Sequence, residues 1–79
     1  MRAIILCKLG IKVIKTVIEE IIAIPQITKV MSLTGDYDLL AEIEVETSEE
    51  LYEIFSEKID LIDGIIASNT HVVMKAWEK

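Results

Sequence analysis

The chain of 79 residues contains few cysteines, prolines, glycines or aromatic residues: one Cys, one Pro, three Gly, one Phe, one Trp and two Tyr. The single cysteine, Cys7, excludes an intramolecular disulfide, and its apolar neighbours favour a buried thiol in a reducing compartment. The apolar run over residues 3–7 is far too short for a signal-peptide core or a membrane span. We therefore expect a cytoplasmic protein that has no membrane partner.

Basic residues are also in deficit, with 14 Asp and Glu against 8 Lys and Arg and a net charge of −6. A negative field repels phosphate backbones, and neither a helix-turn-helix nor a zinc-finger spacing is present, so we expect no direct binding to nucleic acid. The only histidine, His71, has no second histidine or cysteine at metal-ligand spacing. No glycine-rich phosphate loop follows a strand, and we expect neither a metal nor another cofactor.

Aliphatic residues are abundant instead: the hydrophobic fraction is 52%, and isoleucine occurs 15 times. The length allows a single domain over residues 1–79, and a chain this short buries only about 60–65% of its unfolded surface. One small core cannot hide this many apolar side chains. We therefore expect an oligomer that covers the excess.

The apolar pattern predicts six elements in the order strand, helix, strand, strand, helix, strand. The predicted strands are Arg2 to about Leu9, 27–34, 39–45 and a last run from Ile65 to Trp77 that includes a short tail. The predicted helices are Ile11 to Ile24, closed by Pro25, and a segment from Thr47 to Asp63-Gly64. Two repeats of strand-helix-strand leave no room for a second domain.

Both helices show an apolar stripe at spacings of three and four residues. The predicted buried stripes are Ile14, Val17, Ile18, Ile21 and Ile22 in the first helix, and Leu51, Ile54, Phe55, Ile59 and Ile62 in the second. Thr47-Ser48-Glu49-Glu50 fits a capping box, which marks the start of the second helix. Right-handed crossovers then predict an α+β, ferredoxin-like βαββαβ sandwich, a four-stranded antiparallel sheet with both helices on one face. The bare face of the sheet predicts a dimeric α+β barrel, in which a second subunit covers that face.

A hairpin signal lies near the middle of the chain, at Gly35-Asp36-Tyr37-Asp38 followed by Leu39-Leu40. Glycine and aspartate suit a tight turn, but a second acid and a tyrosine directly after it are more than a turn requires. The last predicted strand carries two hydroxyl residues two apart, Ser68 and Thr70, before Val72-Val73-Met74. With the order of elements, these features resemble the effector-binding domain of the Lrp/AsnC transcription regulators, also called the RAM domain.

The resemblance covers essentially the whole chain and lacks the family's amino-terminal helix-turn-helix domain, so the chain resembles the stand-alone form. It implies a non-enzymatic module that binds a small molecule, most simply an amino acid, and modulates Lrp/AsnC-type regulators. It also implies a homodimer that assembles into a tetramer, octamer or larger ring with the effector held between dimers. Full-length Lrp/AsnC regulators are the further partners that it suggests.

Residue by residue, the resemblance implies a ligand site made by Gly35, Tyr37 and Asp38 of the hairpin and by Ser68 and Thr70 of the last strand. Asp38 suits the ammonium of a zwitterionic amino acid, whereas hydroxyls and backbone N–H groups suit its carboxylate. Gly35 lets the backbone approach the ligand. The family commonly has threonine at both last-strand positions, so Ser68 departs from its pattern by one methyl group.

Two alternatives remain open at this point. Each residue of the implied site has a structural interpretation, in which Asp36 and Asp38 cap turn amides, Tyr37 packs as an aromatic, and Ser68 and Thr70 are ordinary strand residues. A different function class is a small dimeric α+β barrel enzyme in which His71 acts as a base inside the barrel. The small number of polar residues on the expected inner face disfavours this enzyme, because acid-base catalysis needs positioned ionisable groups.

Overall fold

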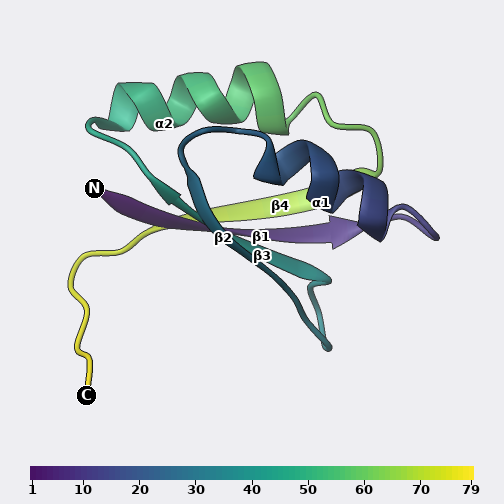
Figure 1. The fold of residues 1–79 in the computed structure, drawn as a ribbon, viewed down its shortest axis with the longest axis horizontal. Coiled ribbons are helices and arrows are strands. Elements are labelled where there is room, and N and C mark those ends of the chain that lie inside the picture. Colours follow the sequence, from purple (N-terminus) through teal and green to yellow (C-terminus); the bar gives the residue numbers. More distant parts are fainter.

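The computed structural model describes every residue from Met1 to Lys79 and has the predicted order of elements (Figure 1). The four strands are β1 (Arg2–Leu9), β2 (Ile27–Ser32), β3 (Leu39–Glu44) and β4 (Ile65–Val72). The helical elements are α1 (Ile14–Ile22), α2 (Ser48–Ile54) and the π-helix η1 (Phe55–Ile59), which continues α2. The strands form one antiparallel sheet in the order β2-β3-β1-β4, and both helices cover the same face of it (Figure 1). The α+β, ferredoxin-like prediction is confirmed.

The core lies between this sheet and the helices, and alternation along the strands decides which side chains enter it. In β1 the buried residues are Ala3, Ile5, Cys7 and Leu9, while Ile4 and Leu6 between them are only half-buried. The period of two therefore places every second side chain of β1 against the helices. The core contains no buried polar or charged residue, and its members are Ala3, Ile5, Cys7, Leu9, Val17, Ile21, Ile24, Leu39, Ala41, Ile43, Val45, Leu51, Ile54 and Ile59.

Helix α1 is shorter than the predicted segment 11–24, because the connection from β1 uses residues 10–13. Lys12 has a φ of 61°, which is outside the helical region for a residue with a side chain. Val17 and Ile21 are buried as predicted, but Ile14 and Ile22 are 41% and 56% exposed. The predicted stripe was therefore too wide, since the sheet covers only the narrower part of this face.

Helix α2 begins at the predicted cap. The Thr47 hydroxyl accepts a hydrogen bond from the Glu50 N–H at 3.1 Å, and the Glu50 carboxylate accepts one from the Glu46 N–H at 2.7 Å. The returning carboxylate thus reaches one residue further back than in the simplest capping box, where it binds the N–H of the cap itself. Together the two bonds satisfy two backbone N–H groups, those of Glu46 and Glu50, that have no carbonyl partner within the helix.

The π-helix η1 explains how the second apolar stripe stays in the core. The two most buried residues around it, Ile54 and Ile59, are five positions apart, one more than an α-helical repeat. The wider turn, closed by the Asp60 N–H on the Phe55 carbonyl at 2.8 Å, accommodates the extra residue. Lys58 consequently stays exposed and Ile59 is only 1% exposed. The π-turn itself was not predicted from the sequence.

The face of the sheet that lacks helices exposes a mainly apolar strip. Met31, Leu40 and Leu6 lie side by side in the register of β2, β3 and β1, and Ile4 lies in the next row. Met31 is 41% exposed, and the other three are half-buried. In the single chain the helices cover one face of the sheet only, and the cover of the other face by a second subunit stays a prediction.

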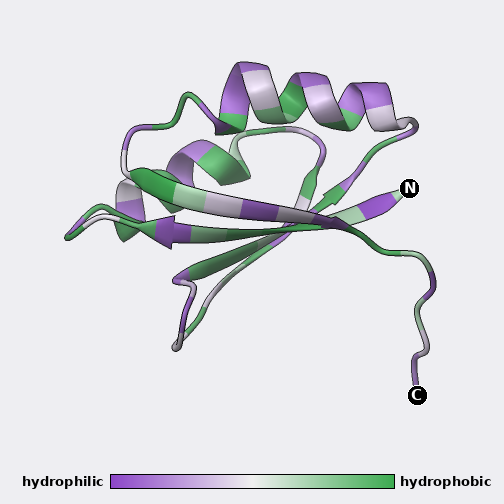
Figure 2. Ribbon diagram, turned by 180° about the vertical axis from the view of Figure 1, so that it is seen from behind, coloured by the Kyte–Doolittle hydropathy of each residue, from purple (hydrophilic) through white to green (hydrophobic).

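The last strand also ends earlier than expected. β4 stops at Val72, and residues 73–79 leave the body of the domain as an extended tail (Figure 2). Met74 and Trp77 of this tail are 97% and 81% exposed. None of the helices has both the length and the apolar character needed to cross a membrane.

Candidate functional site

The hairpin that connects β2 and β3 is shaped by Gly35. Its φ is +104°, a conformation that disfavours any residue with a Cβ, although a Cβ built there would meet no atom within 4 Å. The requirement for glycine thus comes from the backbone conformation, and the space around it is open. The hairpin is closed below its tip by the Leu33 N–H, which donates to the Asp38 carbonyl at 2.9 Å.

Asp38 anchors the base of this hairpin to β1. Its N–H donates to the Cys7 carbonyl at 2.9 Å, and its Oδ2 accepts a hydrogen bond from the Leu9 N–H at 2.8 Å. The residue is half-buried. Oδ1, the second carboxylate oxygen, has no hydrogen-bond partner within the chain. Asp38 therefore caps a backbone donor of β1 and keeps one charged acceptor free.

Tyr37 crosses over β1 to reach the last strand. The side-chain Nδ2 of Asn69 in β4 donates a hydrogen bond to the Tyr37 hydroxyl oxygen. Beside it, the Lys8 Nζ donates to the Asp36 carbonyl at 3.3 Å. The hairpin is thus tied to β1 and to β4 by side chains on the helix-free face. Asn69 was not among the predicted site residues. It lies between Ser68 and Thr70 in β4, so its side chain points to the face opposite theirs.

Ser68 and Thr70 lie on the opposite face of the sheet. They are in register with the buried Cys7 and Ile5, so their side chains point toward the helix layer. Thr70 lines an apolar groove of about 400 Å³ between β4 and the second helix, together with Ser48, Leu51, Tyr52 and Phe55. Tyr37 and Asp38 are consecutive in the hairpin and both are hydrogen-bonded to other strands, whereas Ser68 and Thr70 lie on the other face of the sheet, apart from them.

The remaining reactive groups lie elsewhere. Burial raises the pKa of the Cys7 thiol from 9.0 to about 11, which keeps it protonated and unreactive at neutral pH. His71 is exposed on the helix-free face, opposite Ile4, and lines none of the three hollows of the surface. The most voluminous hollow, about 590 Å³, lies near the start of β2 and contains no predicted site residue.

The domain combines a ferredoxin-like fold with a central hairpin whose Asp38 and Tyr37 side chains are hydrogen-bonded to β1 and β4, next to a sheet face that no helix covers. Residues 2–79 match the family model described as the Lrp/AsnC ligand binding domain, and the chain belongs to this family. It is 35% identical over 79 residues to the HTH-type transcriptional regulator FL11 of Pyrococcus horikoshii, a match that covers 100% of this chain and 52% of that protein. The chain thus spans about half the length of the curated regulators it matches.

Solved structures and a second kind of relative extend this comparison. TTHA0845 from Thermus thermophilus is 27% identical, with a TM-score of 0.90 over 99% of this chain and 98% of that one. NMB0573 of Neisseria meningitidis, solved as an L-Met complex, is 16% identical, with a TM-score of 0.83 over 99% of this chain and 52% of that one. A homocitrate synthase of Sulfolobus acidocaldarius is 34% identical over 60 residues, which are 76% of this chain but only 13% of the enzyme.

Proposed function

We propose that the chain is a non-enzymatic effector-binding module whose ligand is a small α-amino acid. The observation that carries this proposal is the way the polar atoms of the hairpin are used. Asp38 Oδ2 and the Tyr37 hydroxyl oxygen are engaged by groups of the chain itself, which fixes both side chains. One acceptor, Asp38 Oδ1, and one donor, the Tyr37 hydroxyl proton, remain for a ligand.

These two free groups complement the charges of an amino acid. An ammonium group donates to a carboxylate oxygen in a charge-assisted hydrogen bond, and a hydroxyl proton donates to the ligand's carboxylate. The space around Gly35 is open, so that a ligand can approach the hairpin backbone closely. Because the side chains of the hairpin are already held, the ligand orders few groups on binding, which lowers the entropic cost of association.

Ser68 and Thr70 enter this site only if a second copy supplies them, because in one chain they face the helix layer. We therefore place the ligand between molecules, with the hairpin of one and β4 of another on either side. The L-Met complex of the structural neighbour NMB0573 supports an amino-acid ligand for a domain of this fold. The apolar groove beside Thr70 would then receive apolar side-chain atoms of the ligand or of the neighbouring copy.

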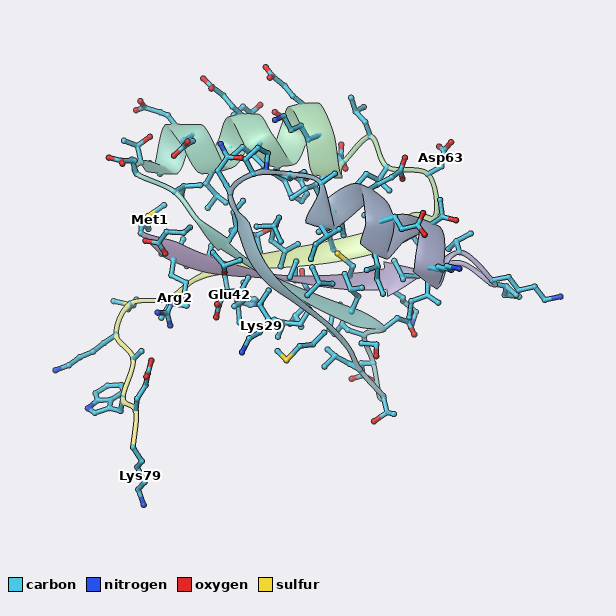
Figure 3. The ribbon with its side chains drawn as sticks, in the orientation of Figure 1. Met1, Arg2, Lys29, Glu42, Asp63 and Lys79 are labelled. Atoms are coloured by element: carbon cyan, nitrogen blue, oxygen red, sulfur yellow. The ribbon has the colours of Figure 1, made fainter.

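The helix-free face supports the assembly that such a site requires. Met31, Leu40, Leu6 and Ile4 form an apolar strip that water would otherwise contact, and the same face of a second copy covers it most simply. Lys29 and Glu42 lie opposite each other at the margin of this strip (Figure 3). Charged residues at the rim and apolar residues at the centre are typical of protein interfaces.

The module, as proposed, regulates other proteins when it binds its effector. The matches with regulators cover about half of their length, and the match with homocitrate synthase covers a small part of the enzyme. A domain that recurs beside different partners fits a sensor better than a catalyst. We propose that it acts on full-length Lrp/AsnC regulators by joining them in mixed assemblies.

A thermal-shift screen against the twenty common L-amino acids, followed by calorimetry on those that stabilise the protein, tests ligand binding. A ligand bound only by the native state stabilises it by RT ln(1 + [L]/Kd), which raises the unfolding temperature. Asp38→Asn retains an acceptor for the Leu9 N–H but removes the charge, and should weaken binding at least about tenfold. Asp36→Asn, on the same hairpin, is the control and should bind as the wild type does. Equal affinity of both variants would reject the role of Asp38.

Light scattering tests the assembly. We expect the wild type to be at least a dimer at micromolar concentration, and Leu6→Lys to shift it toward the monomer by placing a charge in the apolar strip. Lys15→Glu on the exposed side of α1 is the control. A wild-type mass of 8.9 kDa would refute the proposed dimer.

A further inference from the structure

Asn69 contacts the hairpin from the last strand, outside the set of residues that the sequence predicts for the site. It lies within β4 on the helix-free face, in register with Leu6 of β1. Its Nδ2 donates to the hydroxyl oxygen of Tyr37, a residue 32 positions earlier in the chain. Because β1 separates β4 from β3 in the sheet, the tyrosine ring reaches across a whole strand to make this contact. The position of the phenol thus depends on a strand to which the hairpin is not directly paired.

The direction of this hydrogen bond determines what Tyr37 offers to a ligand. A phenol has one proton to donate and lone pairs that accept. Since the amide N–H of Asn69 donates to the oxygen, the hydroxyl proton of Tyr37 points away from Asn69. The neighbouring Asp38 is arranged in a corresponding way, because the Leu9 N–H occupies Oδ2 and leaves Oδ1 as an acceptor.

We propose that Asn69 is a positioning residue for effector recognition, which holds the Tyr37 hydroxyl in place and directs its proton toward the ligand. The site consequently takes ligands that present a strong acceptor, a carboxylate, to Tyr37 and a donor, an ammonium, to Asp38. This inference rests on the proposed amino-acid binding and adds a residue that determines its specificity. Asn69 acts through Tyr37 and does not itself touch the ligand.

Two substitutions separate the parts of this role. Asn69→Ala removes the donor and frees the hydroxyl to rotate, and affinity for an amino acid should fall by about threefold to tenfold. Asn69→Asp is nearly isosteric, but its carboxylate accepts the Tyr37 proton and turns the phenol lone pairs toward the ligand. Affinity should then fall by about thirtyfold or more for the amino acid. The loss should be smaller for the corresponding amino-acid amide, whose carbonyl is a weaker acceptor.

A double-mutant cycle with Tyr37→Phe decides whether the effect passes through the phenol. Calorimetry would use the common L-amino acid that the wild type binds best, and its carboxamide. In the Tyr37→Phe background, Asn69→Ala should change affinity less than about twofold. His71→Ala, two residues along β4 on the same face, is the matched control and should bind as the wild type does.

The outcomes separate this inference from the proposed function. If the wild type binds none of the twenty amino acids, the proposed function is wrong and this inference falls with it. If the wild type binds one of them and the Asn69 variants bind it equally well, the proposed function stands and only the role of Asn69 is rejected. An Asn69→Ala loss that persists without the Tyr37 hydroxyl would also overturn the inference, because it would show that Asn69 acts independently.

Discussion

Replacement of Asp38 by alanine should destabilise the domain as well as weaken ligand binding. Oδ2 of Asp38 accepts the Leu9 N–H at 2.8 Å, and Leu9 is only 9% exposed, so the substitution leaves a nearly buried backbone donor without a partner. A hydrogen bond to a charged group contributes roughly 1.5–3 kcal/mol, and half-burial places this bond at the lower end, about 1.5 kcal/mol. For a domain of this length, 1 kcal/mol shifts the melting temperature by about 4–8 °C. We therefore expect Asp38→Ala to melt about 6–12 °C below the wild type.

Circular dichroism during heating, without ligand and at one protein concentration, measures this shift. Asp38→Asn keeps a neutral acceptor for the same N–H, so it should lose about half as much stability as Asp38→Ala. Asp36→Ala removes an exposed carboxylate that makes no hydrogen bond within the chain, and should stay within about 0.5 kcal/mol of the wild type. If Asp38→Ala melts no earlier than Asp36→Ala, the carboxylate does not anchor the hairpin. The assignment of Oδ1 as the free acceptor would then also fail.

Gly64→Ala should cost more stability than Gly35→Ala, because both glycines have positive φ but a Cβ on Gly64 would lie 2.8 Å from a valine methyl, whereas a Cβ on Gly35 meets open space. Urea unfolding should give about 1 kcal/mol for Gly35→Ala and at least about 2 kcal/mol for Gly64→Ala, and equal values would contradict the packing argument. Burial raises the pKa of Cys7 from 9.0 to about 11, so the folded state favours the neutral thiol. The neutral thiol therefore stabilises the folded state fully below pH 9, and this contribution is lost between about pH 9 and 11. The free energy of unfolding should therefore fall more steeply over this range in the wild type than in Cys7→Ala, and parallel pH profiles would show that the buried thiol does not contribute. Ile59→Ala should cost about 2–4 kcal/mol and Lys58→Ala less than about 0.5 kcal/mol, since the π-turn puts only the former in the core; similar losses for the two would mean that the turn is α-helical in solution.

The arrangement of the elements could be predicted because local patterns decide it. The alternation of Leu39, Ala41, Ile43 and Val45 with glutamates determines the buried face of β3, and the capping residues from Thr47 onward mark the start of α2. Two features depended on contacts between distant residues and were missed. The start of α1 moves to Ile14 because the β1–α1 connection is held against the α2–β4 loop, where the Gly10 N–H donates to the Gly64 carbonyl at 2.8 Å. The π-turn depends on how Ile59 fits the finished core.

The candidate site was predictable only as a set of residue types. The sequence marks Tyr37 and Asp38 as unusual for a turn, but it does not show that Asp38 binds the Leu9 N–H or that Tyr37 meets Asn69. Both contacts follow from the register of β1 with its two neighbours. The same register separates Ser68 and Thr70 from the hairpin, because adjacent residues of a strand point to opposite faces. A spacing of two identifies residues that share a face and leaves open which face it is.

The order of the sheet makes β2 and β4 its two edge strands, and they differ in how they can meet other chains. β2 carries Lys29, whereas the eight residues of β4 include no Asp, Glu, Lys or Arg, in a chain that has 22 of them. Charged side chains on an edge are a common protection against pairing with foreign strands. The backbone N–H and C=O groups along the free side of β4 therefore form the edge at which this sheet most readily grows. Aggregation by strand addition should therefore begin at β4 before β2.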